Sequence, residues 1–203
     1  MIALVDYGLG NIQAFANIFR RLGLPVISAN TPEALSGATK IVLPGVGAFD
    51  WAMRKLDASG MREALDDMVL RRRVDVLGVC VGMQMMARKS DEGDLPGLGW
   101  IDAEVRRLPA RSSDHVLPLP HMGWNDVTPT STDCLFRGMN SPQFYFLHSY
   151  YFVPARVQDS LATTNYGISF TSAVRSGNVY GTQFHPEKSH DWGVQLLRNF
   201  AEI

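Results

Sequence analysis

The chain has 203 residues, 46% hydrophobic and 19% charged, which is enough to bury a full core as one domain, although two smaller domains would also fit. Its formal net charge of -1 gives no field that would attract nucleic acid or an anionic membrane. No apolar run is long enough for a signal-peptide core or a membrane span, so we expect a cytoplasmic protein with neither kind of partner.

The first half of the sequence predicts strands that alternate with helices. An apolar run predicts a strand at 2–7, and apolar residues at helical spacing predict a helix at 11–23 that ends at Gly23. Further elements are expected in the order strand 25–29, strand 41–43, loop 44–47 with a helix after it, helix 61–73, and a strand, tight turn and helix over 74–89. This alternation indicates right-handed crossovers and a mostly parallel sheet covered on both faces.

The composition changes from about residue 97. Segments rich in aromatic and β-branched residues, such as 143–155 and 170–187, are separated by turn residues, which predicts antiparallel strands. A final helix is expected at 192–203. The fold class is therefore α/β, with an antiparallel β extension in the C-terminal half, and we expect residues 1–203 to form a single domain.

Cys80 stands in "GVCVG", where the predicted strand ends and the next helix begins. Gly78 and Gly82 flank it at the spacing of the G-x-S-x-G nucleophile elbow, with sulfur in place of oxygen. Such an elbow needs small flanking residues, because the nucleophile is held on a strained turn against neighbouring backbone. A core cysteine beside packing glycines is the alternative interpretation.

The other cysteine, Cys134, is expected to be inert. The two cysteines have neither CxxC spacing nor a cluster with histidines, which gives little support for a disulfide framework or a structural zinc site. We therefore expect no metal and no cofactor.

A thiolate that takes part in acyl transfer needs a proton-transfer partner and a group that orients it. His185 is followed by Pro186 and Glu187, and the proline favours an extended backbone at His185. Positions i and i+2 of an extended chain project to the same side, so the Glu187 carboxylate can set the tautomer of His185. Taken alone, this tripeptide is more often an ordinary loop.

A second glycine loop, Gly45-Val46-Gly47, supplies backbone N–H groups that could hold an oxyanion together with the N–H of Val81. A plain strand-to-helix turn is the alternative. The other four histidines differ in their expected roles. We expect His121 and His148 to be structural or to line a site or interface, and we expect His115 and His190 to be solvated.

Taken together, "GVCVGMQ" and "QFHPEKS" resemble the nucleophile elbow and the His-Glu motif of the triad-type (class I) glutamine amidotransferases. Within that family, "DYGLGN", "PGVGAF", "PHMGWN", "FLHSYY" and the short length are similar to the glutaminase subunits of imidazole glycerol phosphate synthase. The resemblance runs essentially end to end. It implies a flavodoxin-like three-layer α/β fold.

The resemblance also implies a role for each matching residue. Cys80 would be the nucleophile, His185 the general base and acid, and Glu187 its orienting carboxylate, in the hydrolysis of L-glutamine to glutamate and ammonia. The glutamine pocket would consist of Gly45, Val46, Gly47, Val81, Gln84, Ser149 and Tyr150.

The chain has no GxxxxGK[ST] phosphate loop and no room for a second catalytic domain, so the ammonia must be used on another polypeptide. The resemblance implies a heterodimer with a (β/α)8-barrel cyclase, which makes imidazole glycerol phosphate and aminoimidazole carboxamide ribotide in histidine biosynthesis. The interface would carry Asn11, Trp124, Tyr145 and Lys188, with Lys188 in an ion pair between subunits. An ordinary packed or solvated surface is the alternative.

Two segments depart from the family pattern. Val81 stands where leucine is frequent, and "MMARKSDEG" follows where an apolar-aromatic segment is common. These departures leave open a paralogue that feeds ammonia to a different synthase, such as one that amidates a sugar for surface polysaccharide. A glutamine-independent cysteine hydrolase or a binding module of the same fold is more remote, because such proteins need neither the His-Pro-Glu motif nor Gln84.

Overall fold

The computed structural model describes residues 1–111, 116–131 and 134–203, apart from the side chain of Cys134. The predictions for the solvation of His115 and the inertness of Cys134 therefore lie outside the described residues. The strands are β1 (Ile2–Val5), β2 (Val26–Ala29), β3 (Lys40–Gly45), β4 (Asp75–Cys80), β5 (Lys89–Ser90), β6 (Ala103–Arg107), β7 (His121–Asp126), β8 (Thr128–Pro129), β9 (Gln143–His148), β10 (Tyr150–Pro154), β11 (Ser160–Asn165), β12 (Ser169–Ser176) and β13 (Val179–Thr182).

The α-helices are α1 (Ile12–Arg21), α2 (Pro32–Leu35), α3 (Phe49–Ala58), α4 (Arg62–Asp66), α5 (Val81–Met85) and α6 (His190–Glu202). A π-helical turn spans Asp67–Arg71, and 3-10 turns span Cys134–Phe136, Val157–Asp159 and Pro186–Lys188. Among the ranges given above, no helix combines the length and the apolar character needed to cross a membrane.

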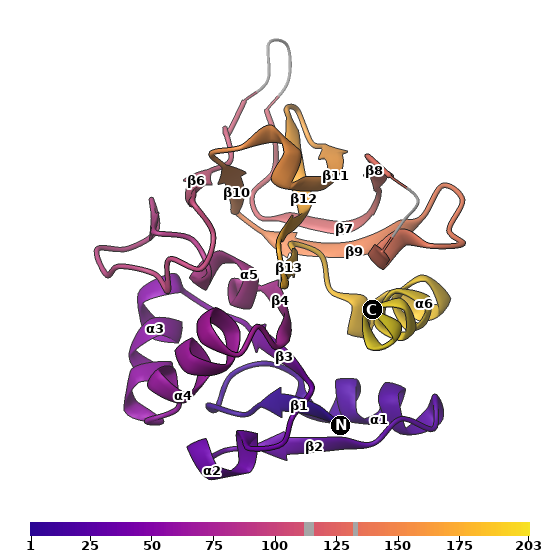
Figure 1. Ribbon diagram of the computed structural model, residues 1–203. Helices are drawn as coiled ribbons and strands as arrows, with labels where there is room; N and C mark the ends of the chain where they lie inside the picture. The colour runs from indigo at the N-terminus through magenta and orange to yellow at the C-terminus, as the bar shows by residue number, and fades with distance from the viewer. Residues whose placement is uncertain (112–115, 132–133) are drawn as a thin grey trace.

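The first half of the chain forms the parallel part of one large sheet. Strands β2, β1, β3, β4 and β13 lie side by side in this order, and each adjacent pair is parallel. Helices α3, α4 and α5 lie on one side of these strands, and α1 and α6 lie on the other (Figure 1). The predicted α/β class with a parallel sheet between two helical layers is confirmed.

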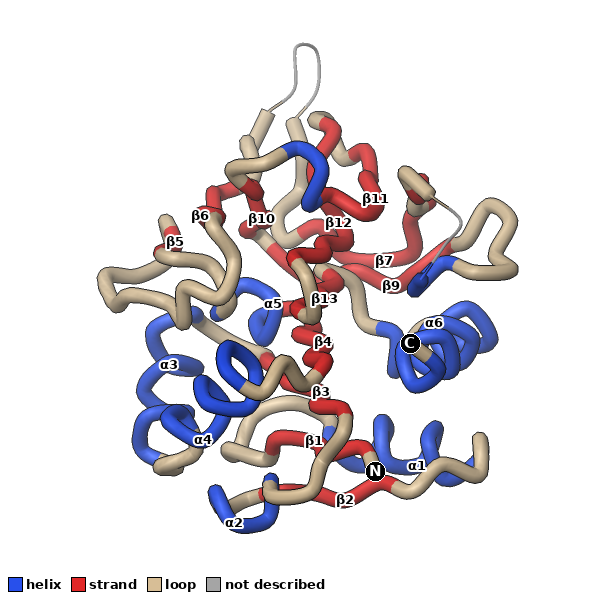
Figure 2. Tube along the Cα trace, viewed as in Figure 1, coloured by secondary structure: helices blue, strands red, loops and turns tan. Residues whose placement is uncertain are grey.

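The second half adds antiparallel strands to the same sheet. Strand β12 pairs antiparallel with β13, with β10 and with β11. Strand β6 in turn pairs antiparallel with β10. Strands β7 and β9 form a separate antiparallel ribbon, which lies between this extension and α6 (Figure 2). The predicted antiparallel extension is also confirmed.

Some element ends differ from the sequence prediction. Strand β3 does not stop at 43 but continues through Pro44 and Gly45, which pair with Val79 and Cys80 of β4. A proline fits there because the pairing of β1 with β3 ends at Val42, so no strand on that side needs its missing N–H. The helix expected at 61–73 is shorter: α4 ends at Asp66 and a π-helical turn follows.

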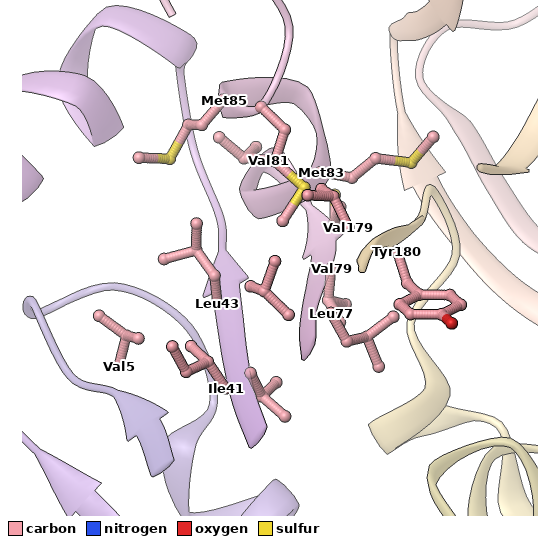
Figure 3. Packing of buried hydrophobic residues seen from close by; sticks show 14 of the residues in the cluster. Val5, Ile41, Leu43, Leu77, Val79, Val81, Met83, Met85, Val179 and Tyr180 are labelled. Atoms are coloured by element: carbon pink, nitrogen blue, oxygen red, sulfur yellow. The ribbon is translucent and has the colours of Figure 1, made fainter. Parts of the chain in front are cut away.

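The core lies where the helical layers meet the parallel strands. Every residue of β3 is buried, as are all residues of β4 after Asp75, which is typical of strands covered on both faces. Figure 3 shows how α5 packs onto them: Val81, Met83 and Met85 lie above Leu43 and Val79, and Val179 of β13 borders the same cluster.

The start of α5 rests directly on the backbone of β3. A Cβ added to Gly82 would lie 1.9 Å from the carbonyl oxygen of Leu43, and one added to Gly45 would lie 2.4 Å from the amide nitrogen of Gly82. Atoms cannot approach so closely, and the neighbours are backbone that cannot move aside. These two glycines therefore let β3 and α5 meet without any side chain between them.

We expect the substitution Gly82→Ala to destabilise the fold by about 1–3 kcal/mol or more, as overpacking of a close backbone contact does. Urea unfolding measures the change. Arg54→Ala, on the exposed face of α3, is the control and should stay within about 0.5 kcal/mol of the unsubstituted chain. A Gly82→Ala chain as stable as this control would contradict the packing described here.

Candidate active site

Cys80 ends strand β4 in a conformation that few residues other than glycine adopt. Its φ is 55° and its ψ is −113°, and α5 begins at the next residue. Such a backbone costs about 1–3 kcal/mol and persists only where the surroundings enforce it. Here the pairing of Gly45 with Cys80 and the contact of Gly82 with β3 enforce it. The backbone thus forms the strained strand-to-helix turn that the glycine spacing predicts.

His185 follows strand β13, the parallel neighbour of β4, and this adjacency brings it beside Cys80. Its Nδ1 lies 2.9 Å from Oε1 of Glu187, and both side chains are almost completely buried. Ser189 fixes the turn, since its hydroxyl donates to the carbonyl of His185 at 2.6 Å and accepts from the amide of Tyr145 at 3.0 Å. The structure therefore brings the three predicted triad residues together.

The charge state of His185 is set by two opposing influences. Burial by itself would lower the pKa of its imidazole, but interaction with Cys80 and then with Glu187 raises that pKa to about 10. His185 therefore favours the protonated form beside the sulfur of Cys80. A proton on this ring can be delivered to a leaving group on the Cys80 side.

A pocket with a volume of about 270 Å³ opens over Cys80, near the lower end of the range for small-molecule sites. Most of the predicted pocket residues line it; Gly45 does not, nor does the predicted triad residue Glu187. The lining consists of Val46, Gly47, Cys80, Val81, Gln84, Glu92, Pro120, Leu147, His148, Ser149, Tyr150, His185 and Lys188.

Gln84 is held by hydrogen bonds within the protein. Its Nε2 donates to the main-chain oxygen of Tyr150 at 3.1 Å and to Oε1 of Gln183 at 3.0 Å. Both N–H groups of the amide are therefore engaged. Its Oε1 is left as an acceptor on the side chain that borders the pocket.

Two contacts were not predicted from the sequence, one made by a residue that lines the pocket and one made by a residue outside the lining. Glu92, in the segment that departs from the family pattern, accepts from the amide of Phe49 at the start of α3 at 2.9 Å, and burial raises the pKa of its carboxyl. The hydroxyl of Tyr7 donates to the carbonyl of Pro44 at 2.8 Å and so anchors the end of β3. Burial, and to a smaller extent the electrostatic interaction with Cys80, raises the pKa of this hydroxyl. Sequence spacing gives no signal for either contact.

His121 and His148 form a buried pair beside the pocket. The Tyr150 carbonyl can only accept, so His148 donates to it from Nδ1 at 2.8 Å and must accept at Nε2. His121 then donates from Nδ1 to that nitrogen at 3.0 Å and accepts from Asn125 at 3.2 Å. Both rings are neutral, because burial lowers the pKa of His121 to about 4 and that of His148 to about 3.

Three of the four predicted interface residues gather on one face. Trp124 of β7 contacts Tyr145 of β9 edge-on, with ring centroids 6.4 Å apart, and Lys188 lies over the Tyr145 ring at 5.8 Å. The exposed ring of His190 stacks on Trp124 at 5.3 Å, which the sequence did not indicate. Asn11 instead caps α1 by accepting from the amide of Ala14 at 3.2 Å.

Metal ligation has no support in the geometry. Within the part of the chain that the structure describes, no three His, Cys, Asp or Glu residues are grouped so that they could hold a metal ion. The expectation that the chain uses no cofactor stays a prediction.

Comparisons with known proteins give a consistent result. The family model of class-I glutamine amidotransferases matches residues 3–203. The imidazole glycerol phosphate synthase subunit HisH of Bdellovibrio bacteriovorus is 57% identical, and that of Leptospira borgpetersenii is 47% identical, with 100% of both chains covered in each case. A crystal structure described as a glutamine amidotransferase has a TM-score of 0.75 at 21% identity, covering 99% of this chain and 97% of that one, which supports the fold.

The neutral His121–His148 pair predicts a loss of stability in acid. Both histidines bind protons more tightly in the unfolded chain, with a pKa near 6.5, than in the folded chain. The free energy of unfolding should therefore fall from about pH 6.5 downward, by up to about 2 kcal/mol per histidine between pH 7 and pH 5. His185 shifts in the opposite direction, so its contribution is fully present below pH 6.5 and is lost only as the pH rises toward 10.

Urea unfolding at pH 7 and pH 5 tests this prediction. His148→Asn keeps a donor for the Tyr150 carbonyl but removes one titrating ring, so it should show a smaller difference between the two pH values. His190→Asn replaces an exposed histidine with φ of 46°, a conformation that asparagine tolerates, and should retain the full difference. Equal pH dependence in His148→Asn and in the original chain would refute the assignment.

Proposed function

The chain belongs to the class-I glutamine amidotransferase family, and we propose that it is the glutaminase subunit of an imidazole glycerol phosphate synthase. The full-length matches to relatives of that name carry the proposal. The strained Cys80 beside the buried His185–Glu187 pair supports the corresponding chemistry. We treat residues 1–203 as one catalytic domain, and the cytoplasmic location that the sequence favours stays a prediction.

Glutamine would bind with its side-chain amide at Cys80 and its amino-acid end toward Gln84. The Oε1 of Gln84 and the carboxylate of Glu92 are acceptors suited to the substrate ammonium group. Main chain at Ser149 and Tyr150 completes this side of the pocket. The amide carbon then lies within reach of the sulfur.

The first half-reaction releases ammonia. The Cys80 thiolate attacks the side-chain carbonyl carbon of glutamine, and its electron pair forms the C–S bond while the carbonyl oxygen takes the negative charge. Backbone N–H groups of the Val46–Gly47 segment and of Val81 stabilise this oxyanion. As the carbonyl reforms, the C–N bond breaks and His185 gives its proton to the departing nitrogen, leaving a γ-glutamyl thioester.

The second half-reaction returns the enzyme to its starting state. Neutral His185 takes a proton from a water molecule, whose oxygen attacks the thioester carbon. The C–S bond then breaks and Cys80 leaves as the thiolate, with glutamate as the product. Glu187 stabilises the imidazolium and fixes the ring, at 2.9 Å from Nδ1.

The ammonia would pass to a (β/α)8-barrel cyclase subunit bound over the β7–β9 ribbon. Met122 and Trp124 on β7 and Leu147 on β9 leave 65%, 47% and 37% of their surfaces exposed there. Exposed apolar side chains gathered on one ribbon are typical of a protein interface. Lys188 borders both this face and the pocket, which suits an ion pair across the interface.

A paralogous subunit that serves a different synthase is not favoured, because relatives covering the whole chain are named as subunits of imidazole glycerol phosphate synthase. Growth of a histidine auxotroph that lacks this subunit separates the two. Rescue by this chain together with its native barrel partner supports the proposal. Restored glutaminase activity without growth would point to another acceptor.

The catalytic assignment predicts the effects of two substitutions on glutamate release from glutamine, measured with the liganded barrel partner present. Cys80→Ala should abolish it. Glu187→Gln should lower kcat by about 10²- to 10⁴-fold, because the ring loses the carboxylate that orients it and supports its charge. Near-normal turnover in Cys80→Ala would rule out the covalent mechanism.

The interface assignment predicts that Trp124→Ala weakens binding of the barrel partner by about 10-fold or more, as the loss of a central interface tryptophan does. Calorimetric titration measures the change. Trp51→Ala is the matched control, because Trp51 has a similar exposed fraction, 50%, but lies on α3. Equal effects of the two substitutions would place the partner elsewhere.

A further inference from the structure

Gln183 lies between β13 and the His185 turn, and the mechanism described above gives it no role. It is completely buried, so it does not border the pocket and cannot hold the substrate. Its Nε2 nevertheless lies 3.7 Å from the sulfur of Cys80, within hydrogen-bond range for sulfur. A fully buried amide directed at the reacting atom requires an explanation.

The direction of this contact is fixed by a chain of hydrogen bonds. A main-chain oxygen can only accept, so the group that Gln84 places 3.1 Å from Tyr150 must be its NH2. The second N–H of that amide donates to Gln183 at 3.0 Å, so the Gln183 atom facing it must be the oxygen. The NH2 of Gln183 is then necessarily the end turned toward Cys80.

Two groups contact the sulfur: one favours the thiol form of Cys80 and the other favours the thiolate. The carbonyl oxygen of Leu147 lies 3.9 Å away, can accept from a thiol, and would repel a thiolate. The Gln183 amide is a donor, which a thiolate accepts far more strongly than a thiol. The balance between them influences which form of Cys80 is populated.

We infer that Gln183 is a catalytic residue whose side-chain amide donates a hydrogen bond to the Cys80 sulfur and stabilises it as the thiolate. The inference rests on the proposed function. Gln183 would act at two steps of the cycle. The first is before attack, when the thiolate must be present, and the second is thioester hydrolysis, when the sulfur leaves with the electron pair of the broken C–S bond. Gln84 keeps the amide from turning its oxygen to the sulfur.

Alkylation of Cys80 by iodoacetamide measures the thiolate directly and needs no glutaminase activity. Gln183→Met replaces the amide with an apolar side chain of similar length. We expect alkylation at neutral pH to slow by about 10- to 100-fold, the value of a hydrogen bond to a charged group, and the inflection of the rate–pH profile to move upward. The rate in urea should be the same for all variants, because the contact exists only in the folded chain.

Titratable groups face the sulfur from several elements, and the variant leaves all of them in place. Tyr7 follows β1, Glu92 follows β5, His148 ends β9, and the segment after β13 carries His185, Glu187 and Lys188. Ser172→Ala is the matched control. Ser172 lies on β12 and its main-chain oxygen accepts from the amide of Gln183, whereas its buried hydroxyl has no hydrogen-bond partner among the residues that the structure describes. Its alkylation profile should equal that of the unsubstituted chain.

An unchanged rate and inflection in folded Gln183→Met would overturn the inference. If that variant does not fold, Gln84→Met decides, because it removes the donor that holds the oxygen of Gln183 away from the sulfur. The NH2 of Gln183 is then no longer fixed toward Cys80, so alkylation should slow. A rate equal to that of the unsubstituted chain again refutes the role. Normal alkylation chemistry in a chain that never releases glutamate would instead count against the proposed function, so the two failures are distinguishable.

Discussion

The site depends on one local constraint, the left-handed backbone of Cys80 at the end of β4. A residue with a side chain holds φ of 55° only if the adjoining chain permits no other conformation. Strand β3 restricts the backbone of Cys80 through the pairing of Gly45 with Cys80. The first turn of α5 restricts it further, because Gly82 packs directly on the carbonyl of Leu43. The energy of the strain is offset by the packing of β3, β4 and α5, in which every residue except Asp75 is buried.

The same constraint determines where the rest of the site must come from. The carboxyl ends of parallel strands lie at one edge of the sheet, and the Cys80 sulfur stands at that edge. Strand β13, parallel to β4, delivers His185 to the same edge, and the antiparallel extension then brings the Leu147–Tyr150 segment over the pocket. Cys80 thus comes from the first half of the chain, whereas His185 and the Leu147–Tyr150 part of the pocket wall come from the second half.

The features that could be predicted from the sequence are those that depend on residues close together in the chain. The elbow glycines, the His-Pro-Glu turn and the alternation of strands and helices are patterns within a few residues of each other, and the structure shows each of them. Contacts between distant segments left no such signal: Gln183 meets Gln84 across 99 positions, and Tyr7 meets Pro44 across 37. The continuation of β3 through Pro44 was missed for a related reason, since it depends on where the neighbouring β1 stops.

Two hydrogen-bond chains of fixed direction meet at the main-chain oxygen of Tyr150. One arrives from the β7–β9 ribbon through His148, and the other from the pocket through Gln84. A carbonyl oxygen has two lone pairs, so both are used, and its position is determined from both sides. A displacement of the ribbon that moves His148 must then move the Tyr150 carbonyl or break its bond. Gln84 holds the same oxygen and also contacts Gln183, whose amide lies against the Cys80 sulfur. The face proposed to bind the synthase and the sulfur proposed to react are therefore joined by contiguous polar contacts.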